Sequence, residues 1–596
     1  LFQNPLKKLY IKNLPDKKYP QSELWKYGIS GDLPIILVKM KQINDVYVLE
    51  DILKAYEYYR AKNIEVDLVI LDEEINSYEK YVKEGIINQI LNKNLSYMQN
   101  VRGGIFLLED VEDINLFEYR ASLVLDAQKG HLARQLKDME DEYLESIEQI
   151  GYEKPSEIYD TEEKIVQEIN TEKLKYYNEY GGFSEDGKEY IMKINRDNRL
   201  PTTWSNICAN EKFGTLVTES LGGYTWSENS RLNRITAWSN NQVTDTPSEI
   251  IYMQDKKTGK TWSLGVNPMP DNSDYVVTYG LGYAKYKHTS MGVIQELDTF
   301  VAKEDSVKIN LLNLKNLAPE KKKLKLVYYI KPVIGEDELL SKGCIELEQK
   351  NNTVIAKNNA NENEEYIYVS SNEKIKSYTA SKAFFIGKGT IANPEGLKKV
   401  ELDNESGEGT NSIIAIEIEV ELEAFENKDI SFILGAQKSV LECQDSSYKY
   451  SKIQACVNEY ENVKRYWREL VDKVQVNTPV ESFNILINGW LCYQTIVSRL
   501  WGRTGFYQSG GAFGFRDQLQ DTLGLKYYSP GFMKKQIIKH SKHQFIEGDV
   551  EHWWHEETSR GIRTRFSDDL LWLVYAVIEY INTTGDYSIL DEVTQY

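Results

Sequence analysis

The chain has 596 residues, and this length predicts about four domain-sized units at ~150 residues each. Lys and Arg total 71 whereas Asp and Glu total 91, so the formal net charge is −20. Such an acidic surface repels phosphate backbones and excludes a nucleic-acid binder unless a local basic patch outweighs it. No apolar run approaches the ~20 residues that span a bilayer, so we expect no membrane segment in this chain.

Cysteine and aromatic content narrow the class further. Five cysteines are scattered without CxxC spacing, and the chain does not open with a basic segment followed by an apolar stretch. Both observations favour a reduced, cytoplasmic protein over a disulfide framework, a zinc ribbon or a secreted protein. Aromatic residues make up 12% of the chain. Flat aromatic side chains stack on the apolar C–H faces of sugar rings, so this composition suits carbohydrate binding.

Residues 1–125 alternate between strand and helix signals. Short apolar runs at 33–38, 66–71 and 103–108 predict strands, and a helical pattern follows each of the first two. This order predicts a small α/β domain with a parallel sheet. A Gly-Gly pair opens the third run, but the segment contains neither GxGxxG nor a P-loop, so we assign no cofactor to it.

The next two segments differ from each other in residue pattern. Residues 126–175 are acidic and helical in pattern, which predicts a solvated helical connector. From 176 to 440, short alternating segments recur about every 8–12 residues and are separated by turn formers. This pattern predicts a large antiparallel β-sandwich.

The pattern becomes helical again in the last part of the chain. A linker-helix region is expected at 441–478, followed by a helical domain over 479–596. Helices are predicted at 479–500, 531–547 and 568–584, and the loops between them are rich in Gly, Trp, His, Asp and Arg. Long helices joined by such loops favour a helical toroid with its site in the mouth.

Histidine, tryptophan and charged residues gather in the last hundred or so residues. Four of the six histidines lie between 540 and 555, and six of the eleven tryptophans lie between 467 and 572. So many polar and aromatic residues do not make a core, because each buried charge would need a partner. They predict a pocket, and the candidate residues are Arg516, Asp517, Gln520, Asp521, His552, Trp553, Trp554, His555, Arg563, Arg565, Asp568 and Asp569.

Two other interpretations of this cluster are weaker. A metal site would use the imidazoles of His540, His543, His552 and His555. An HxxH pair on a helix places ligands poorly and no cysteine assists, so we expect no metal. A plain surface cluster would pair Arg563 and Arg565 with Asp568 and Asp569, whereas in a pocket the two arginines would suit an oxyanion such as phosphate.

A sugar site is the favoured interpretation. Asp517 and Asp521 lie four residues apart, so a helix that begins there places both carboxylates on one face. Arg516 offers a fork-shaped donor beside the acceptor Asp517, which suits vicinal hydroxyls. The adjacent tryptophans 553 and 554 offer faces on which a sugar ring can stack.

Five tracts are specific when taken together: 181–184 (GGFS), 199–206 (RLPTTWSN), 222–231 (GGYTWSENSR), 515–521 (FRDQLQD) and 548–555 (GDVEHWWH). Over 176–596 the chain resembles glycoside hydrolase family 94, the inverting phosphorylases of β-glucosides. The upstream stretch 25–34 (WKYGISGDLP) resembles the segment before this module in 1,2-β-oligoglucan phosphorylases and in the C-terminal part of cyclic β-1,2-glucan synthases. That stretch narrows the expected substrate to β-1,2-glucan.

The resemblance implies a multidomain α+β protein with a small α/β domain, a large antiparallel β-sandwich, a linker helix and the start of an (α/α)6 helical barrel. It also implies a homodimer. The implied reaction is phosphorolysis, with inorganic phosphate as co-substrate and no cofactor. Phosphate is already an anionic nucleophile, so cationic and hydrogen-bonding groups that place it replace the second carboxylate of inverting hydrolases. By family analogy Arg516 and Asp517 grip the non-reducing glucose, while residues 552–555 and 563–569 shape the site around it.

One part of the family pattern is missing. The family's general acid is the Asp of a Trp-Asn-Asp tract, and these 596 residues contain no such tract. A twelve-helix barrel at about 20–25 residues per helix needs about 240–300 residues, whereas 118 remain from 479 to 596. We therefore expect a longer polypeptide with the catalytic acid beyond Tyr596, and no catalytic residue is named within this chain.

Three functions stay open. The first is inverting phosphorolysis of β-1,2-linked glucooligosaccharides to α-glucose 1-phosphate and a shortened oligosaccharide. The second is that of a C-terminal module of a cyclic β-1,2-glucan synthase. The third is that of a non-catalytic carbohydrate-binding fragment.

Overall fold

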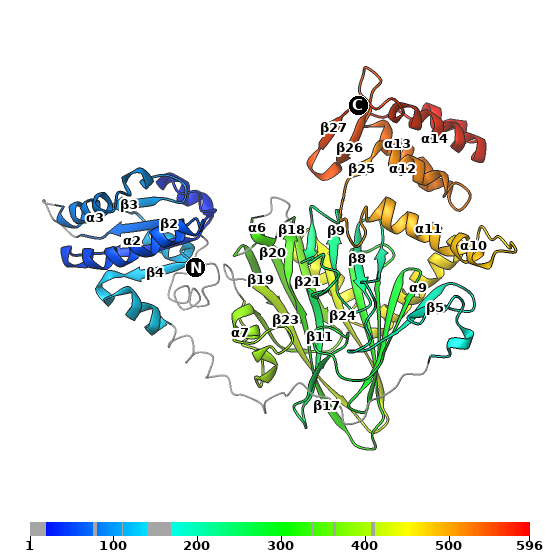
Figure 1. Ribbon diagram of the computed structural model, residues 1–596, viewed down its shortest axis with the longest axis horizontal. Coiled ribbons are helices and arrows are strands. Elements are labelled where there is room, and N and C mark those ends of the chain that lie inside the picture. Colours follow the sequence, from blue (N-terminus) through cyan, green and yellow to red (C-terminus); the bar gives the residue numbers. More distant parts are fainter. Residues whose placement is uncertain are drawn as a thin grey trace.

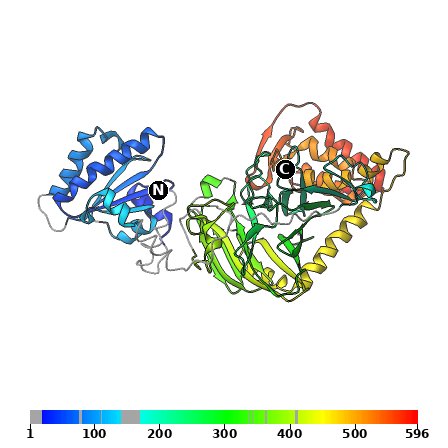
Figure 2. The ribbon, with the colours of Figure 1, turned by 60° about the horizontal axis from the view of Figure 1, so that its bottom comes forward.

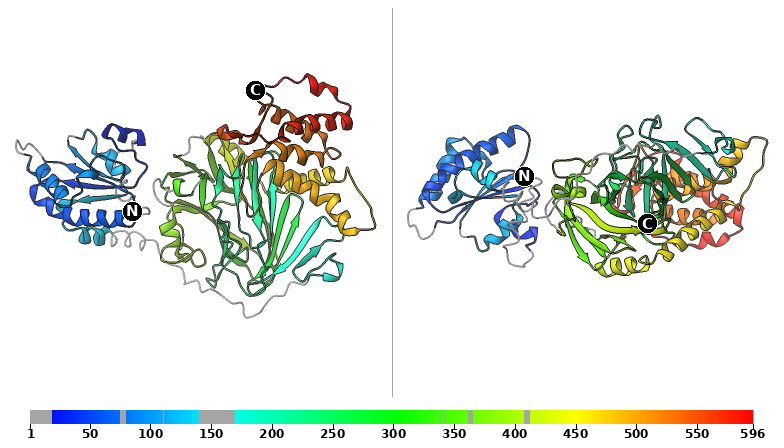
Figure 3. Two further views of the ribbon diagram at one scale, coloured as in Figure 1. Left: turned by 45° about the horizontal axis from the view of Figure 1, so that its top comes forward. Right: turned by 90° about the horizontal axis from the view of Figure 1, so that it is seen from below.

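The computed structural model describes residues 19–74, 80–109, 111–139, 169–336, 338–341, 343–360, 365–406 and 412–595. These residues form an α/β domain, a β-sandwich and a helical C-terminal part (Figure 1). The α/β domain lies to one side of the sandwich, and the C-terminal helices lie over one end of it (Figures 1 and 3). The multidomain α+β class expected from the sequence is confirmed.

A parallel sheet forms the centre of the α/β domain, with strand order β3-β2-β1-β4. Alternate residues of β1 enter two separate apolar clusters, so both faces of the sheet are buried, as is usual for parallel sheets. Helices α2 and α3 cover one face and α4 covers the other. Strand β4 was not expected, because its four residues are too few to show a period. The bounds are β1 Ile35–Met40, α2 Val46–Ala61, β2 Asp67–Asp72, α3 Tyr81–Asn92, β3 Ile105–Glu109, α4 Ile114–Arg120 and β4 Leu123–Asp126.

The expected acidic connector at 126–175 falls largely outside the described residues, which omit 140–168. Within its described part Asp126 still belongs to β4, and residues 132–139 are helical.

The sandwich of the described residues is built from antiparallel sheets, as expected. One sheet has the order β19-β20-β21-β24-β16-β15-β14-β13-β6-β5, a second β12-β11-β17-β23-β22 and a third β18-β10-β9-β8-β7. The bounds are β5 Gly181–Phe183, β6 Glu189–Ile194, β7 Ser205–Ala209, β8 Phe213–Thr218, β9 Gly223–Ser227, β10 Arg234–Thr236, β11 Glu249–Asp255, β12 Thr261–Ser263, β13 Tyr275–Gly280, β14 Tyr283–Ser290, β15 Val293–Val301, β16 Val307–Asn316, β17 Lys322–Ile330, β18 Pro332–Gly335, β19 Ile345–Lys350, β20 Thr353–Asn358, β21 Tyr366–Ser371, β22 Ile375–Ser381, β23 Ser412–Leu422 and β24 Asn427–Gln437. The short helices α6 Glu338–Ser341 and α7 Lys382–Ile386 lie between strands.

The linker region consists of α8 Val440–Lys449 and α9 Ile453–Val471, and α9 runs along the outside of the sandwich (Figure 2). The Tyr460 hydroxyl on α9 donates to Asp298 Oδ1 at 2.7 Å. Trp467 approaches the backbone of Gly282 so closely that a Cβ atom there would overlap its ring. Trp467, together with Trp490 and Tyr493 further along the chain, belongs to the same apolar cluster as the sandwich strands. Sandwich and first helices therefore share one continuous core.

The C-terminal part begins with a helical run that contains α10 Glu481–Ile485, a π-helical segment Leu486–Trp490, α11 Leu491–Gln494 and a second π-helical segment Thr495–Trp501. Helices α12 Phe515–Leu523, α13 Pro530–Ser541 and α14 Asp569–Thr584 follow, with a small sheet of β25 Phe513–Gly514, β26 Glu551–His555 and β27 Arg560–Arg563. No helix in the described ranges is long and apolar enough to cross a membrane.

The helix expected at 531–547 ends earlier, at Ser541. Backbone hydrogen bonds explain the difference: Glu551 N donates to His543 O at 3.0 Å, and Phe545 N donates to Asp549 O at 2.8 Å. These bonds fold residues 543–551 back on themselves and lead the chain into β26. His543 therefore lies outside the helix that carries His540, so the assumption of an HxxH pair on one helix was wrong.

Candidate functional site

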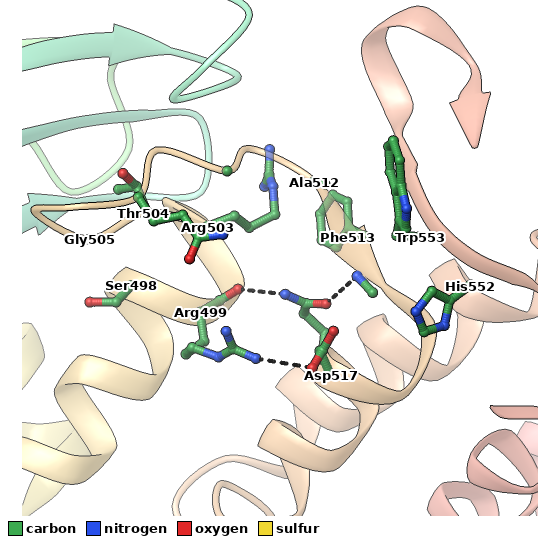
Figure 4. Close-up of a pocket in the computed structure, with 14 residues that line it drawn as sticks. Ser498, Arg499, Arg503, Thr504, Gly505, Ala512, Phe513, Asp517, His552 and Trp553 are labelled. Atoms are coloured by element: carbon green, nitrogen blue, oxygen red, sulfur yellow. Dashed lines mark hydrogen bonds and ion pairs between the residues drawn. The ribbon is translucent and has the colours of Figure 1, made fainter. Parts of the chain in front are cut away.

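A cavity of about 480 Å³ lies in the C-terminal part, next to the sandwich (Figure 4). This volume falls in the range of ~300–1,000 Å³ that is usual for small-molecule sites. The cavity lies between the π-helical segment Thr495–Trp501, the loop 502–512, the start of α12 and β26. Its lining residues are Ser498, Arg499, Arg503, Thr504, Gly505, Gln508, Gly510, Ala512, Phe513, Gly514, Asp517, Gln518, His552 and Trp553.

Asp517 occupies the first turn of α12, where the helix dipole favours a negative charge. Its carboxylate lies over Gly514, and a Cβ atom at that position would overlap Asp517 Oδ2. Gln518, which the sequence analysis missed, accepts a hydrogen bond from Gly514 N at 2.7 Å and donates to Arg499 O at 3.2 Å. Gln518 therefore fixes the start of α12 against the helix before it, and so fixes the position of Asp517 in the cavity (Figure 4).

Arg499 contacts both candidate aspartates of α12. Its Nε lies 2.9 Å from Asp521 Oδ2 and its Nη2 lies 3.7 Å from Asp517 Oδ1. The prediction that the two carboxylates share one helix face is confirmed. Burial raises the pKa of Asp521, although Arg499 acts in the opposite direction. Asp517 lines the cavity, whereas Asp521 does not, and Gln520 is exposed outside it.

Arg516 does not line the cavity and pairs with Asp568. Its Nη1 lies 2.9 Å from Asp568 Oδ2, an atom that also accepts from Trp572 Nε1 at 3.3 Å. The hydrogen bond from Arg516 lowers the pKa of Asp568. This pair links the start of α12 to the start of α14.

Arg563 does not form the surface pairs that were considered for it. Two of its guanidinium nitrogens each lie 2.6 Å from a different carboxylate oxygen of Asp549. Asp569 instead accepts from His552, whose Nδ1 lies 2.7 Å from Asp569 Oδ2. Arg565 is exposed, and neither arginine lines the cavity.

Strand β26 brings His552 and Trp553 to the cavity wall. Adjacent residues of a regular strand point to opposite faces, but the pairing of β26 with β27 shifts register between Glu551 and Trp553. His552 also stacks on Phe566, with ring centroids 4.4 Å apart.

Trp554 and His555 are buried and do not line the cavity. The Trp554 ring stacks on His543 at 3.9 Å and on Phe513 at 5.6 Å between centroids. The expectation that Trp554 offers a face to a sugar is therefore wrong. Its apolar ring is buried in the core between α12, α13 and α14, where removal from water stabilises the fold. Burial lowers the pKa of His555, and its Nδ1 has no hydrogen-bond partner among the residues that the structure describes.

The loop 502–512 forms one wall of the cavity and is held by the sandwich. The Tyr224 hydroxyl shares a hydrogen bond with Thr504 Oγ1 at 2.8 Å, and Asn229 Nδ2 donates to Gly511 O at 3.0 Å. Ser509 Oγ donates to Ser230 O at 2.7 Å. Residues 224–230 belong to the GGYTWSENSR tract, so that tract shapes the site from another domain.

Arg503 is the buried anchor of this loop. Its side chain is 6% exposed, its Nε donates to Gly511 O at 2.9 Å, and its guanidinium lies 4.2 Å from the Phe513 ring centroid. Arg499, Arg503, Thr504 and Gln508 also line the cavity, but they were not predicted from the sequence. For the last three, the signal that could have found them is the glycine-rich stretch 502–514 directly before FRDQLQD, since such loops carry sites. Arg499 lies before this stretch.

His540 predicts a pH dependence of stability. It is fully buried beside the start of α12, with Nδ1 2.7 Å from Gln536 O and Nε2 3.3 Å from Gly514 O. Burial lowers its pKa from 6.5 to about 4. Between these values the unfolded imidazole binds a proton that the folded one does not, so stability falls with decreasing pH, by about 3 kcal/mol over the whole window.

Chemical denaturation between pH 7.5 and 5.5 measures the upper part of this effect, which amounts to about 1 kcal/mol. The pH slope should be smaller in His540→Gln, whereas His131→Gln, at a histidine whose side chain is 69% exposed, should keep the slope of the unmodified chain. An equal slope in all three proteins would show that His540 is not the titrating group.

Family comparisons agree with this architecture. The family description "Glycosyl hydrolase 94, supersandwich domain" matches residues 188–453, and "Glycosyl hydrolase 94 superfamily, catalytic domain" matches residues 466–596. The chain therefore belongs to glycoside hydrolase family 94, and the cavity lies in the segment that matches the catalytic domain.

Three individual relatives share 30%, 26% and 23% sequence identity with the chain. The chain is 30% identical to "Cyclic beta-(1,2)-glucan synthase NdvB" of Rhizobium meliloti over 96% of its own length and 21% of that protein's. It is 26% identical to "N,N'-diacetylchitobiose phosphorylase" of Vibrio furnissii, over 70% of the chain and 56% of the relative. It is 23% identical to "Solabiose phosphorylase" of Paenibacillus borealis, over 70% and 54% respectively. The chain thus spans about half the length of these phosphorylases and about a fifth of the synthase.

Proposed function

We propose that this chain takes part in inverting phosphorolysis of β-1,2-linked glucooligosaccharides, releasing α-glucose 1-phosphate and a shortened oligosaccharide. The observation that carries the proposal is the charge of the cavity wall: Asp517 is its one carboxylate among the described residues, and Arg499 and Arg503 line it too. An inverting hydrolase needs two carboxylates, one of them to activate water. Phosphorolysis replaces the activated water by an anionic nucleophile, which cationic groups favour, so it needs no carboxylate for that step. We assign Asp517 to sugar binding and not to proton transfer.

Asp517 and Trp553 supply the two contacts that a sugar needs in this cavity. The carboxylate accepts hydrogen bonds from ring hydroxyls, and the indole offers an apolar face. His552, fixed by Asp569, offers its Nε2 to the same space. Inorganic phosphate is the co-substrate, and the reaction requires no cofactor.

The proposed β-1,2 linkage rests on how much of the chain each relative matches. The synthase relative, whose name specifies a β-(1,2)-glucan, matches 96% of the chain. The chitobiose and solabiose phosphorylases match 70% of it. This difference also supports the second candidate, a module of a cyclic β-1,2-glucan synthase. A homodimer in the cytoplasm stays a prediction from the family resemblance.

Phosphate dependence is the direct test. The protein that contains these 596 residues, at its natural length, is incubated with β-1,2-glucooligosaccharides, with and without inorganic phosphate, and glucose 1-phosphate and free glucose are measured. We expect glucose 1-phosphate in the presence of phosphate and no sugar consumption in its absence. Consumption without phosphate would indicate hydrolysis. Saccharide binding without turnover at any phosphate concentration would favour the third function, that of a binding protein.

A further inference from the structure

Tyr507 is an exposed aromatic residue that is nevertheless held in place. The residue is 62% exposed. Its hydroxyl donates to Gln242 Oε1 at 2.6 Å and shares a hydrogen bond with Thr202 Oγ1 at 3.2 Å. Asn240 Nδ2 donates to the Tyr507 carbonyl at 3.2 Å. Two residues of the sandwich domain thus fix a side chain that surface exposure alone would leave free to rotate, and a third holds its backbone.

The backbone of Tyr507 lies at the rim of the cavity. It lies on the loop between Gly505 and Gln508, which both line the cavity and whose backbones are hydrogen-bonded to each other. The neighbouring Phe506 is buried and packs edge-on against Trp238, with centroids 5.1 Å apart. The loop therefore anchors one aromatic ring in the sandwich and leaves the next one facing solvent beside the cavity.

We propose that Tyr507 is a stacking platform for a sugar ring of the oligosaccharide that extends beyond the rings held inside the cavity. This inference rests on the proposed function, because it takes a β-glucooligosaccharide as the ligand. The hydroxyl of Tyr507 is already bonded, so the part of the residue that can serve a ligand is its ring face. Sugar rings present apolar C–H faces that match such a surface.

The fixed geometry is what makes the ring suitable. A mobile tyrosine would have to lose rotational freedom when a ligand binds, and this loss would weaken binding. The hydrogen bonds to Thr202 and Gln242 restrict the rotation of the Tyr507 ring before any ligand binds. Thr202 lies in the RLPTTWSN tract, so the platform gives part of that tract a role in recognising chain length.

Calorimetry with saccharides of increasing length tests the platform. Dissociation constants are measured for β-1,2-linked glucose disaccharide, trisaccharide and tetrasaccharide with the unmodified chain, Tyr507→Ala and Tyr507→Phe. We expect Tyr507→Ala to weaken binding of the longer saccharides about tenfold and of the disaccharide less than twofold. Tyr507→Phe keeps the ring but loses the hydroxyl hydrogen bonds that hold it, so its affinity for long saccharides should lie between those of the unmodified chain and Tyr507→Ala. Tyr448→Ala, at a 75% exposed tyrosine on α8, is the matched control and should change none of the constants.

The other outcomes separate the platform from the proposed function. An equal loss at all three lengths would overturn the platform, because Tyr507 would then act only by shaping the cavity loop. Unchanged constants in Tyr507→Ala would overturn it as well. If the unmodified chain binds none of these saccharides, both the platform and the proposed function fail. If the unmodified chain binds these saccharides and Tyr507→Ala does not alter how affinity depends on saccharide length, the platform fails and the proposed function stands.

Discussion

Asp517→Asn should weaken saccharide binding about 100-fold while leaving the melting temperature within about 3 °C of the unmodified chain. Asparagine keeps the shape of the side chain but removes the negative charge that strengthens hydrogen bonds from sugar hydroxyls. The stability effect should be small because the Asp517 side chain is 57% exposed and its ion pair with Arg499 is long, at 3.7 Å. Exposed pairs of this kind contribute little to stability.

Calorimetric titration and a thermal melt of the same preparation check both halves of this result. Asp591→Asn makes the same chemical change at an exposed position outside the cavity and should leave binding and melting unchanged. Unaltered saccharide affinity in Asp517→Asn would remove this residue from the site. A loss of binding accompanied by a large drop in melting temperature would instead show that Asp517 is a structural group at the start of α12.

Lys325→Met should lower the free energy of unfolding by about 3–5 kcal/mol. Lys325 on β17 and Glu417 on β23 are both fully buried, with Nζ and Oε2 3.2 Å apart. Lys325 Nζ also donates to Lys399 O at 2.7 Å. Burial already raises the pKa of Glu417 against the opposing effect of Lys325. Removing the ammonium leaves the buried Glu417 carboxyl without its main partner. The carboxyl must then either stay charged without this partner or take up a proton, and both lower the free energy of unfolding.

Denaturant unfolding followed by circular dichroism measures the loss. Lys323→Met lies on the same strand, but the Lys323 side chain is 61% exposed, so this control should leave stability nearly unchanged. The double variant Lys325→Met/Glu417→Leu should recover much of the loss, because it removes the unpaired carboxyl as well. If the single variant is as stable as the unmodified chain, Glu417 does not depend on this ion pair.

Local pattern was sufficient for most of the fold. The alternating run at 413–420 became β23, and the apolar runs at 33–38 and 66–71 became β1 and β2. Helical spacing also sufficed to place Asp517 and Asp521 on one face, because that relation involves a single turn. These features depend on residues close in sequence, and the periodic spacing of apolar and charged residues reports on such local relations.

Features that depend on distant contacts could not be predicted in this way. Trp554 is a core residue because Phe513 and His543 cover its ring, and neither contact follows from its neighbours in sequence. The wall of the cavity depends on Tyr224 meeting Thr504 across 280 positions. The end of α13 at Ser541 was set by backbone pairing with residues that follow it, which overrode local helical preference.

The continuous core of the sandwich and the first C-terminal helices has a consequence for how the chain folds. Trp467, Trp490 and Tyr493 complete the same apolar cluster as the strands, whereas the parallel sheet has clusters of its own. We therefore expect the sandwich and the helices before α12 to unfold as one cooperative unit, whereas α12, α13 and α14, whose apolar side chains form a separate cluster, and the α/β domain can open locally on their own. The cavity lies where these two units meet, because the segment Thr495–Trp501 belongs to the first and α12 to the second, so local opening of α12, α13 and α14 would separate its walls without unfolding the sandwich.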